Sequence, residues 1–124
     1  TAGLATLRFL AKNSRLYDYI GNLGEKARRE VDKQFTERNI PTRSTGIGSL
    51  FQTHFLRTEG LEMRNADDKR TNTLKEKQFE YHFRLLLDGI FFLPEHEGAI
   101  SVAHSEKDID RLVESAGKIA EEMT

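Results

Sequence analysis

Glutamates and histidines gather in the segment that follows the apolar run ending at Pro94. Glu95, His96 and Glu97 come directly after this proline, and His104 follows in the same segment. Carboxylates and imidazoles bind metals and act as general acids and bases. Their spacing here matches neither a His pair one helical turn apart nor a zinc-ligand pattern. We therefore favour a solvated turn, followed by a helix-capping His-Ser pair, over a metal or catalytic centre.

The other candidate groups favour structural roles. His54 stands alone in a predicted strand and His82 in a predicted helix, so we expect each to be a hydrogen-bonded packing residue. The glycine-rich TGIGS stretch precedes a strand and lacks the Lys-Ser/Thr ending of a phosphate-binding loop, which favours a tight bend. The serines lack the G-x-S-x-G elbow of a nucleophile: Ser49, Ser101 and Ser105. The sequence proposes no complete catalytic machine.

The composition excludes several classes of function. The chain has 124 residues, of which 31% are charged, and a formal net charge of −1 at pH 7. A nearly neutral chain has no long-range field to attract nucleic acid or anionic lipid. There is no cysteine, which excludes thiolate zinc sites and disulfides, and no apolar run of about 20 residues that would span a bilayer. We expect no nucleic-acid partner, no membrane partner and a cytoplasmic location.

Apolar residues at helical spacing predict four helices that would position these groups. They cover residues 1–13, Ser14 to about Arg38, about Thr73 to Asp88, and the segment after Ser105. In the second helix basic and acidic residues interleave, which favours intrahelical pairs over a basic patch: Lys26, Arg28, Arg29 and Lys33 with Glu25, Glu30, Asp32 and Glu37. In the third helix the predicted buried side carries Leu74, Phe79, Phe83, Leu86 and Leu87.

The ends of these helices carry capping signals. Asn13 or Ser14 is expected to cap the second helix with its side chain. Gly89 is expected to end the third helix in the left-handed conformation. Ser105, with Asp108 three residues on, predicts a capping box at the start of the last helix.

Residues between the helices predict a small sheet. A strand from Ser49 to Leu56 is expected to pair with a short strand at Thr42–Thr45, and two more short strands are expected at Ile90–Leu93, which would be buried, and Ala99–Val102. The polar stretch Arg57–Asn72 predicts a long exposed loop. The order of these elements predicts an α+β fold, with an antiparallel sheet of about three to four strands and helices on one of its faces.

Four segments, in this order and spacing, resemble the C-terminal small domain of class III pyridoxal-phosphate aminotransferases, and within that class most closely the glutamate-1-semialdehyde 2,1-aminomutases. The segments are TAGLATL, GIGSLFQTHF, FRLLLDGIFFLPE and ISVAHSEKDIDRLVESAGKIAEEM. The most specific parts are Gly48–Phe51, Leu86–Ile90 and Ala103–Asp110. The resemblance covers nearly the whole chain, and it implies the C-terminal domain of a fold-type I enzyme.

In this family a large domain carries the cofactor lysine, an aspartate paired with the pyridine nitrogen, and the phosphate contacts. The resemblance therefore implies that residues 1–124 are the small domain, that residues 1–13 end a helix linking it to an absent large domain, and that the longer enzyme is a homodimer. The chain alone would bind no pyridoxal phosphate and be inactive. None of its lysines is expected to serve as the cofactor lysine: Lys12, Lys26, Lys33, Lys69, Lys75, Lys77, Lys107 and Lys118.

The resemblance also assigns a role to the turn between Ile90 and Glu97. In the family this segment lies on the substrate side of the cofactor, where a glutamate holds an ammonium group of an amino-acid substrate and so steers its orientation. The turn here is about two residues shorter than the family pattern, so Glu97 or Glu95 would fill this role; Glu97 is preferred because it is nearer the following strand.

Two functions remain open besides an aminomutase that converts glutamate 1-semialdehyde into 5-aminolevulinate for tetrapyrrole synthesis. The shortened turn is compatible with a transaminase for other amino compounds. A self-contained, non-catalytic binding module is the alternative from another class. The exposure of the apolar residues at Ala2–Leu10 and Ile90–Leu93 would distinguish the binding module from a part of an enzyme. A large exposed apolar patch would indicate a missing domain or subunit.

Overall fold

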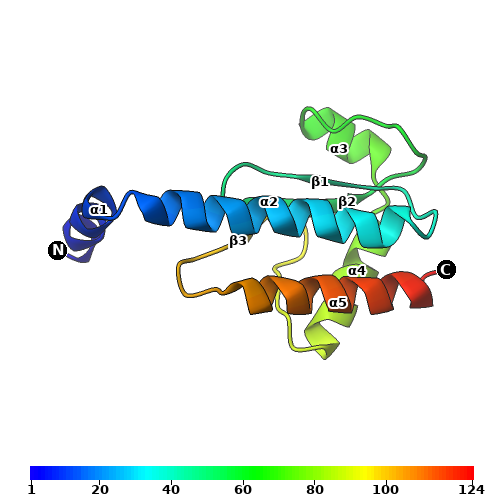
Figure 1. Ribbon diagram of the computed structural model, residues 1–124. Coiled ribbons are helices and arrows are strands. Elements are labelled where there is room, and N and C mark those ends of the chain that lie inside the picture. Colours follow the sequence, from blue (N-terminus) through cyan, green and yellow to red (C-terminus); the bar gives the residue numbers. More distant parts are fainter.

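Figure 1 shows the computed structural model, which describes all 124 residues. The elements, in chain order, are α1 (Ala2–Lys12), α2 (Arg15–Thr36), β1 (Thr42–Thr45), β2 (Leu50–Phe55), α3 (Ala66–Asn72), α4 (Lys75–Leu87), β3 (Gly98–Ala99) and α5 (Glu106–Glu122). The strands form one antiparallel sheet in the order β1-β2-β3. The predicted α+β fold and small antiparallel sheet are confirmed. No helix combines the length and apolarity needed to cross a membrane.

The core lies between the sheet and the helices α2 and α5, which run side by side (Figure 1). Three aromatic rings from α2, β2 and α4 meet at its centre. Phe35 contacts Phe55 and Tyr81 edge to face, with ring centroids 4.9 and 5.4 Å apart. Such contacts add to the burial of the rings themselves. Strand β2 and the helices α2, α4 and α5 all contribute residues to this core, whereas α1 and α3 contribute none.

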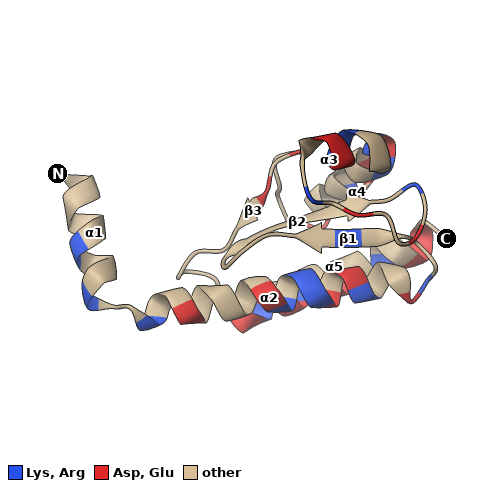
Figure 2. Ribbon diagram, turned by 90° about the horizontal axis from the view of Figure 1, so that it is seen from above, with Lys and Arg blue, Asp and Glu red and all other residues tan.

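Charged residues alternate along the outer face of α2 (Figure 2), as the interleaved sequence predicts. Lys33 pairs at 3.8 Å with Glu37, the residue directly after the end of the helix. Lys26, however, reaches across to α5, where its ammonium lies 2.9 Å from Glu106 and 2.5 Å from Asp110. Lys26, Arg29 and Lys33 are thus paired with carboxylates rather than arranged as a free basic patch, but part of the pairing joins two helices.

One of the predicted caps forms and another does not. At α5 the capping box of Ser105 and Asp108 is present, as predicted. At α2 no side chain caps the helix, and Asn13 instead donates to the carbonyl oxygen of Phe9 at 2.8 Å. Ser14 has helical backbone angles, whereas a capping residue needs an extended backbone. The cap prediction for α2 was therefore wrong because α1 leads almost directly into α2.

The stretch predicted as a loop at 57–72 contains the helix α3, so this prediction was wrong. Asn65 caps α3 by accepting hydrogen bonds from the backbone N–H groups of Asp67 and Asp68 at 2.9 and 3.0 Å. Acidic residues stand in its first turn and basic residues in its last, which matches the helix dipole. No residue of α3 is buried, so hydrophobic periodicity gave no signal for it.

Helix α4 is correctly predicted, but it packs through a different face. Its buried residues are Gln78, Tyr81, His82 and Leu85. Of the five apolar residues predicted to be buried, Leu74 is half-buried and packs against the core, whereas the other four are exposed: Phe79, Phe83, Leu86 and Leu87. Gly89 ends the helix with a φ of 77°, as predicted. Periodicity identifies an apolar stripe, but it does not say which neighbouring element covers that stripe.

The segment Ile90–Leu93 is not a strand, and only half of it packs against the core. Ile90 and Phe92 contact the core, whereas Phe91 and Leu93 are exposed. The last strand is β3, which has two residues and starts one residue before the predicted one at 99–102. Burial of the whole apolar run was therefore a wrong expectation, and the run leaves apolar side chains at the surface.

Candidate functional site

The turn from Pro94 to Glu97 borders two different hollows, and it divides the predicted site residues between them. Glu97 and His104 line a largely apolar hollow of about 480 Å³. Glu95 and His96 line a polar hollow of about 420 Å³ beside α3 and α4. No three His, Asp or Glu side chains come together in a way that would hold a metal ion. The cluster seen in the sequence is thus two separate pairs.

Aromatic rings and a glycine form the wall of the apolar hollow. Phe51 on β2 and Phe92 contact edge to face with ring centroids 5.3 Å apart. Gly98 is required beside them, because a Cβ atom at this position would lie 2.4 Å from the ring of Phe92. Glu97 precedes this glycine, so the start of β3 positions the carboxylate at the edge of the apolar wall.

Glu97 is the free carboxylate of this hollow. Its side chain is exposed and forms no hydrogen bond or ion pair. Asp108, which also lines the hollow, accepts from the backbone N–H and hydroxyl of Ser105 at 2.7 and 2.9 Å, and these hydrogen bonds hold the pKa of Asp108 below its usual range. Arg111 donates to the carbonyl oxygen of Asp88. Glu97 is thus the acidic group at this wall that is available to a cationic ligand.

Glu95 is engaged in holding the turn together. Its carboxylate lies 3.2 Å from the ammonium of Lys75, and its carbonyl oxygen accepts from Lys69 at 3.1 Å. Its backbone has a φ of 65°, a left-handed conformation that is uncommon outside glycine. Local geometry therefore distinguishes the two glutamates in favour of Glu97, although the substrate-side role itself stays a prediction.

The histidines behave mainly as packing residues. His54 is buried, and its Nε2 atom lies 2.9 Å from the hydroxyl of Thr45. Burial and the nearby Lys69 lower the pKa of His54 to about 4, so it is neutral at pH 7. His82 is buried 3.3 Å from the amide nitrogen of Gln78, and burial lowers its pKa. The predicted packing roles are confirmed.

His104 holds a turn before α5. Its Nδ1 atom accepts from the backbone N–H of Ser101 at 3.0 Å, and its carbonyl oxygen accepts from the hydroxyl of Tyr19 at 2.6 Å. The predicted helix-capping His-Ser pair therefore forms only in part: Ser105 caps α5 together with Asp108, whereas His104 contacts Ser101 and takes no part in the cap. The bond from Tyr19 could not be predicted from the sequence, because it joins residues that are far apart in the chain.

The lysines are distributed unequally between the two hollows. No lysine lines the apolar hollow that contains Glu97. In the polar hollow Lys75 pairs with Glu95, and Lys69 donates to Gln52 and Glu95. A cofactor lysine must present a free amine to the cofactor; that no lysine of this chain does so stays a prediction.

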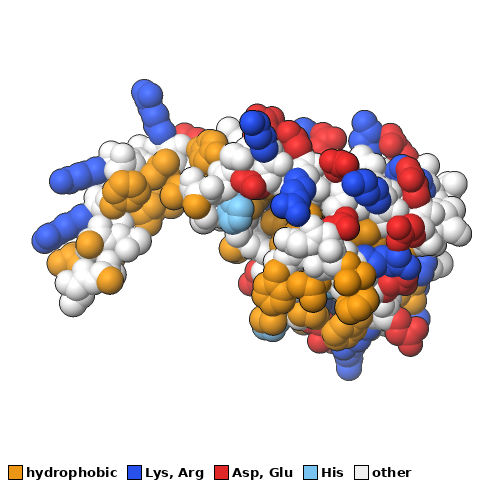
Figure 3. All heavy atoms as spheres, turned by 90° about the horizontal axis from the view of Figure 1, so that it is seen from below, with side chains coloured by type: hydrophobic (Ala, Val, Ile, Leu, Met, Phe, Trp, Pro, Cys, Tyr) orange, Lys and Arg blue, Asp and Glu red, His pale blue; other side chains and the backbone are white.

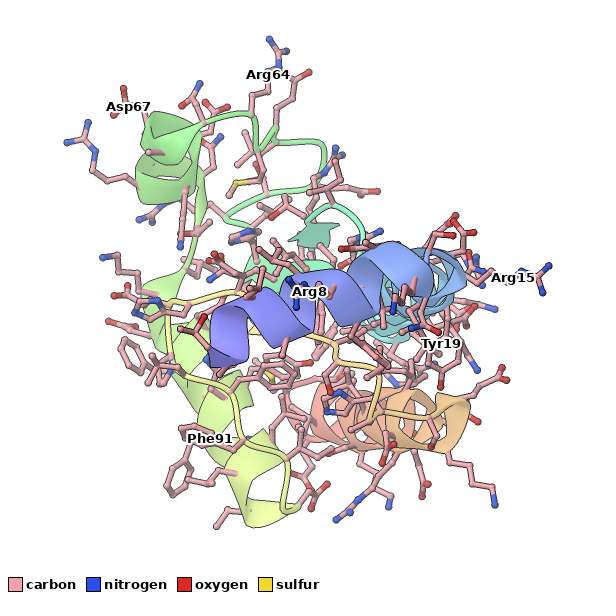
Figure 4. All side chains as sticks on the ribbon, turned by 90° about the vertical axis from the view of Figure 1, so that its left-hand side faces the viewer. Arg8, Arg15, Tyr19, Arg64, Asp67 and Phe91 are labelled. Carbon is pink, nitrogen blue, oxygen red and sulfur yellow. The ribbon has the colours of Figure 1, made fainter.

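Two apolar surfaces are uncovered. The first is on α1, none of whose residues is buried, and it includes Leu4, Leu7 and Phe9. The second, called here the α4 patch, consists of Phe79, Phe83, Leu86, Leu87, Phe91 and Leu93. Figure 3 shows apolar side chains on the projecting α1 and on the body, with a hollow between them. In Figure 4, Phe91 lies beside α4 and away from α2 and α5.

Comparison with curated proteins finds related sequences. No protein-family model matches the chain. The glutamate-1-semialdehyde 2,1-aminomutase of Thermus thermophilus is 37% identical over 120 residues, which cover 94% of this chain and 27% of the relative. The chain therefore spans about a quarter of the length of the curated relatives that it matches.

Solved structures show the same fold. An omega-transaminase from Sphaerobacter thermophilus superposes with a TM-score of 0.79 at 26% identity, over 97% of this chain and 26% of that one. A β-phenylalanine aminotransferase from Variovorax paradoxus gives 0.74 at 25% identity, over 84% and 23%. The resemblance predicted from the sequence is thereby confirmed: over nearly its whole length this chain is similar to a quarter-length part of the glutamate-1-semialdehyde 2,1-aminomutases, with the fold of a class III transaminase C-terminal domain.

Proposed function

We propose that residues 1–124 act as the C-terminal small domain of a pyridoxal-phosphate enzyme of the glutamate-1-semialdehyde aminomutase type, with residues 1–13 linking it to a cofactor-binding domain. The reaction would move an amino group between neighbouring carbons of glutamate 1-semialdehyde and yield 5-aminolevulinate for tetrapyrrole synthesis. The observation that carries this proposal is the 37% identity to an aminomutase over 120 residues. The enzyme would be a cytoplasmic homodimer, and the isolated chain would be inactive.

In this proposal the chain forms one wall of the active site. Pyridoxal phosphate, held by the other domain, would supply the electron sink and the amine carrier. The wall formed by Phe51, Phe92 and Gly98 would exclude water from the substrate side. Excluding water strengthens every charge interaction in the site.

Glu97 would hold the ammonium group of the substrate in this site. Its exposed carboxylate has no partner within the chain, whereas that of Glu95 already pairs with Lys75. When another domain covers the hollow, a carboxylate next to an apolar wall attracts an ammonium group more strongly than it does in water. The carboxylate would set orientation, and it would take no part in breaking bonds.

The uncovered apolar surfaces support a docking partner over a self-contained module. Phe91 is 69% exposed and Leu87 71% exposed. Monomeric proteins rarely leave contiguous apolar patches of this kind uncovered without a function. The α4 patch and α1 would therefore contact the cofactor-binding domain or a second subunit.

A transaminase for other amino compounds is the second candidate. The short turn before Gly98 and the similarity to an omega-transaminase and a β-phenylalanine aminotransferase favour it. Both candidates place the same wall beside the cofactor, and they differ in the substrate that the turn admits.

The coding sequence upstream of Thr1 and the product of the whole gene provide the test. We expect an upstream cofactor lysine, formation of 5-aminolevulinate from glutamate 1-semialdehyde by the whole product, and no cofactor absorption band with the 124-residue chain alone. Amino transfer from other amines to a keto acid, without 5-aminolevulinate formation, would identify the second candidate. An upstream sequence without a cofactor lysine, or a band with the isolated chain, would refute both.

A further inference from the structure

A second hollow lies apart from the wall that contains Glu97. It is bordered by β2, α3, α4 and the turn at Glu95, and it has a volume of about 420 Å³, within the usual range for small-molecule sites. We call it the α3–α4 hollow. Only one of its lining residues is apolar, so its ligand must be recognised by charge and hydrogen bonds.

Cations outnumber carboxylates around this hollow. Lys69, Arg70 and Lys75 line it, and Glu95 is the only carboxylate that does. Glu95 neutralises Lys75 at 3.2 Å, while Arg70 pairs with Asp67, whose side chain points outward from α3 (Figure 4). Both partners of the Arg70–Asp67 pair are highly exposed, so this pair is weak and readily exchanged. The hollow therefore presents positive charge to its interior.

Lys69 is the cation without a carboxylate partner. Its ammonium donates to two neutral oxygens, Gln52 Oε1 at 3.3 Å and the carbonyl oxygen of Glu95 at 3.1 Å. It also contributes to the lowered pKa of His54 on the floor of the hollow. An ammonium has three donors, and one donor of Lys69 remains for a ligand.

The amide of Gln52 supplies an independent observation. Because an ammonium only donates, Lys69 fixes the Gln52 oxygen toward itself, and the Nε2 atom must point elsewhere. This Nε2 atom is buried and has no hydrogen-bond partner. Buried donors are nearly always satisfied, so this amide lacks the acceptor that a buried donor ordinarily has, as do the buried atoms Thr42 Oγ1 and His82 Nδ1 elsewhere in the chain.

We infer that the α3–α4 hollow binds a small molecule carrying a carboxylate or phosphate group, through Lys69, Arg70, Lys75 and the amide of Gln52. The lysines attract the ligand as point charges. When Arg70 exchanges its pair with Asp67 for the ligand, its guanidinium presents two parallel donors to the oxyanion. Neither the proposed aminomutase reaction nor the role of Glu97 depends on this site.

The test is titration of the ¹⁵N-labelled chain with inorganic phosphate and, separately, with succinate, at constant ionic strength. We expect saturable NMR shifts at the Gln52 side-chain amide and in residues 66–75. Binding of one anion only would identify the ligand class. Shifts that rise linearly without saturation, or that spread over the whole surface, would overturn the inference.

Variants separate specific binding from general charge. Lys69→Gln is expected to weaken binding about tenfold, since a hydrogen bond to a charged group contributes about 1.5 kcal/mol or more. The control Lys118→Gln removes the same charge from the exposed face of α5, where it pairs with Glu114, and is expected to leave affinity unchanged. Arg70→Lys keeps the positive charge but removes the two parallel donors of the guanidinium, so it tests whether those donors contribute to binding. Equal losses in Lys69→Gln and Lys118→Gln, with both chains folded by circular dichroism, would refute the site.

Discussion

Substitution of Gly24 by alanine tests a close approach between the backbone of a helix and that of a turn. Gly24 lies on α2 where the helix crosses the turn that leads into β2. A Cβ atom at Gly24 would lie 2.0 Å from the carbonyl oxygen of Gly48 and 3.1 Å from the Cα atom of Ser49. These atoms belong to the backbone, so no rotamer change relieves the clash. Ordinary contacts between heavy atoms are about 3.5 Å or longer, so helix and turn would have to separate by roughly 1.5 Å.

The separation would also break hydrogen bonds. The guanidinium of Arg28 donates to the carbonyl oxygens of Gly48 and Leu50 at 3.0 and 2.6 Å. Overpacking costs about 1–3 kcal/mol, and each lost bond to a charged donor adds about 1.5 kcal/mol or more. The better helix propensity of alanine offsets about 1 kcal/mol of this loss. We expect Gly24→Ala to lower the free energy of unfolding by at least about 2 kcal/mol.

Gly21→Ala is the matched control, one turn earlier on the same helix. There a Cβ atom would meet only the Cα atom of Gly48 at 3.9 Å, which is an ordinary contact. This variant keeps the gain in helix propensity and is expected to be more stable than the parent chain by about 0.5–1 kcal/mol. Urea unfolding followed by circular dichroism measures both. Equal stability of the two variants would refute the packing of α2 against this turn.

Three further predictions concern the surface, pH and the candidate site. Phe83→Glu in the α4 patch should change the free energy of unfolding by less than about 0.5 kcal/mol, whereas Leu85→Ala, from the buried side of the same helix, should lower it by about 2–5 kcal/mol; similar losses in urea unfolding would place the patch in the core instead. The folded-state pKa of His54 is about 4 against an ordinary 6.5, so the unfolded chain binds more protons between these values, and stability should fall as pH drops from 6.5 to 4. His54→Gln should flatten this slope in urea midpoints measured across that range, and an unchanged slope would contradict the burial of the imidazole. In the whole enzyme Glu97→Gln should raise KM by about tenfold through loss of one charge-assisted contact, while Glu95→Gln should not, and the reverse order would exchange their roles.

Some elements were predictable because their signals are local. The stripe of α2, the alternation of β2 and the polar residues of the capping box at Ser105 each act within a few residues of one another. The left-handed Gly89 is also local, since a backbone with positive φ favours glycine whatever surrounds it. Helix α3 was missed because the prediction relied on apolar residues at helical spacing. Its cap and its dipole stabilise α3 without any apolar residue being buried.

The candidate site was only partly predictable. The sequence indicated that Glu95 and Glu97 were the acidic residues of the turn and preferred Glu97. It gave no sign that the turn separates them into two hollows, nor that Lys75 neutralises one of them. The positive environment of Gln52 was also missed, because Lys69 comes from a segment that had been predicted to be a loop.

The sequence by itself determined most of the helices, the pairing of β1 with β2 and the family resemblance of this protein. Only the tertiary structure decided which face of each element is buried. Helix α4 turns Tyr81 and Leu85 inward, together with Gln78 and His82, which contact each other through one hydrogen bond, and leaves its phenylalanines outside. The physical reason is that periodicity describes side chains around their own axis, whereas burial depends on which surfaces of other elements are available to cover them.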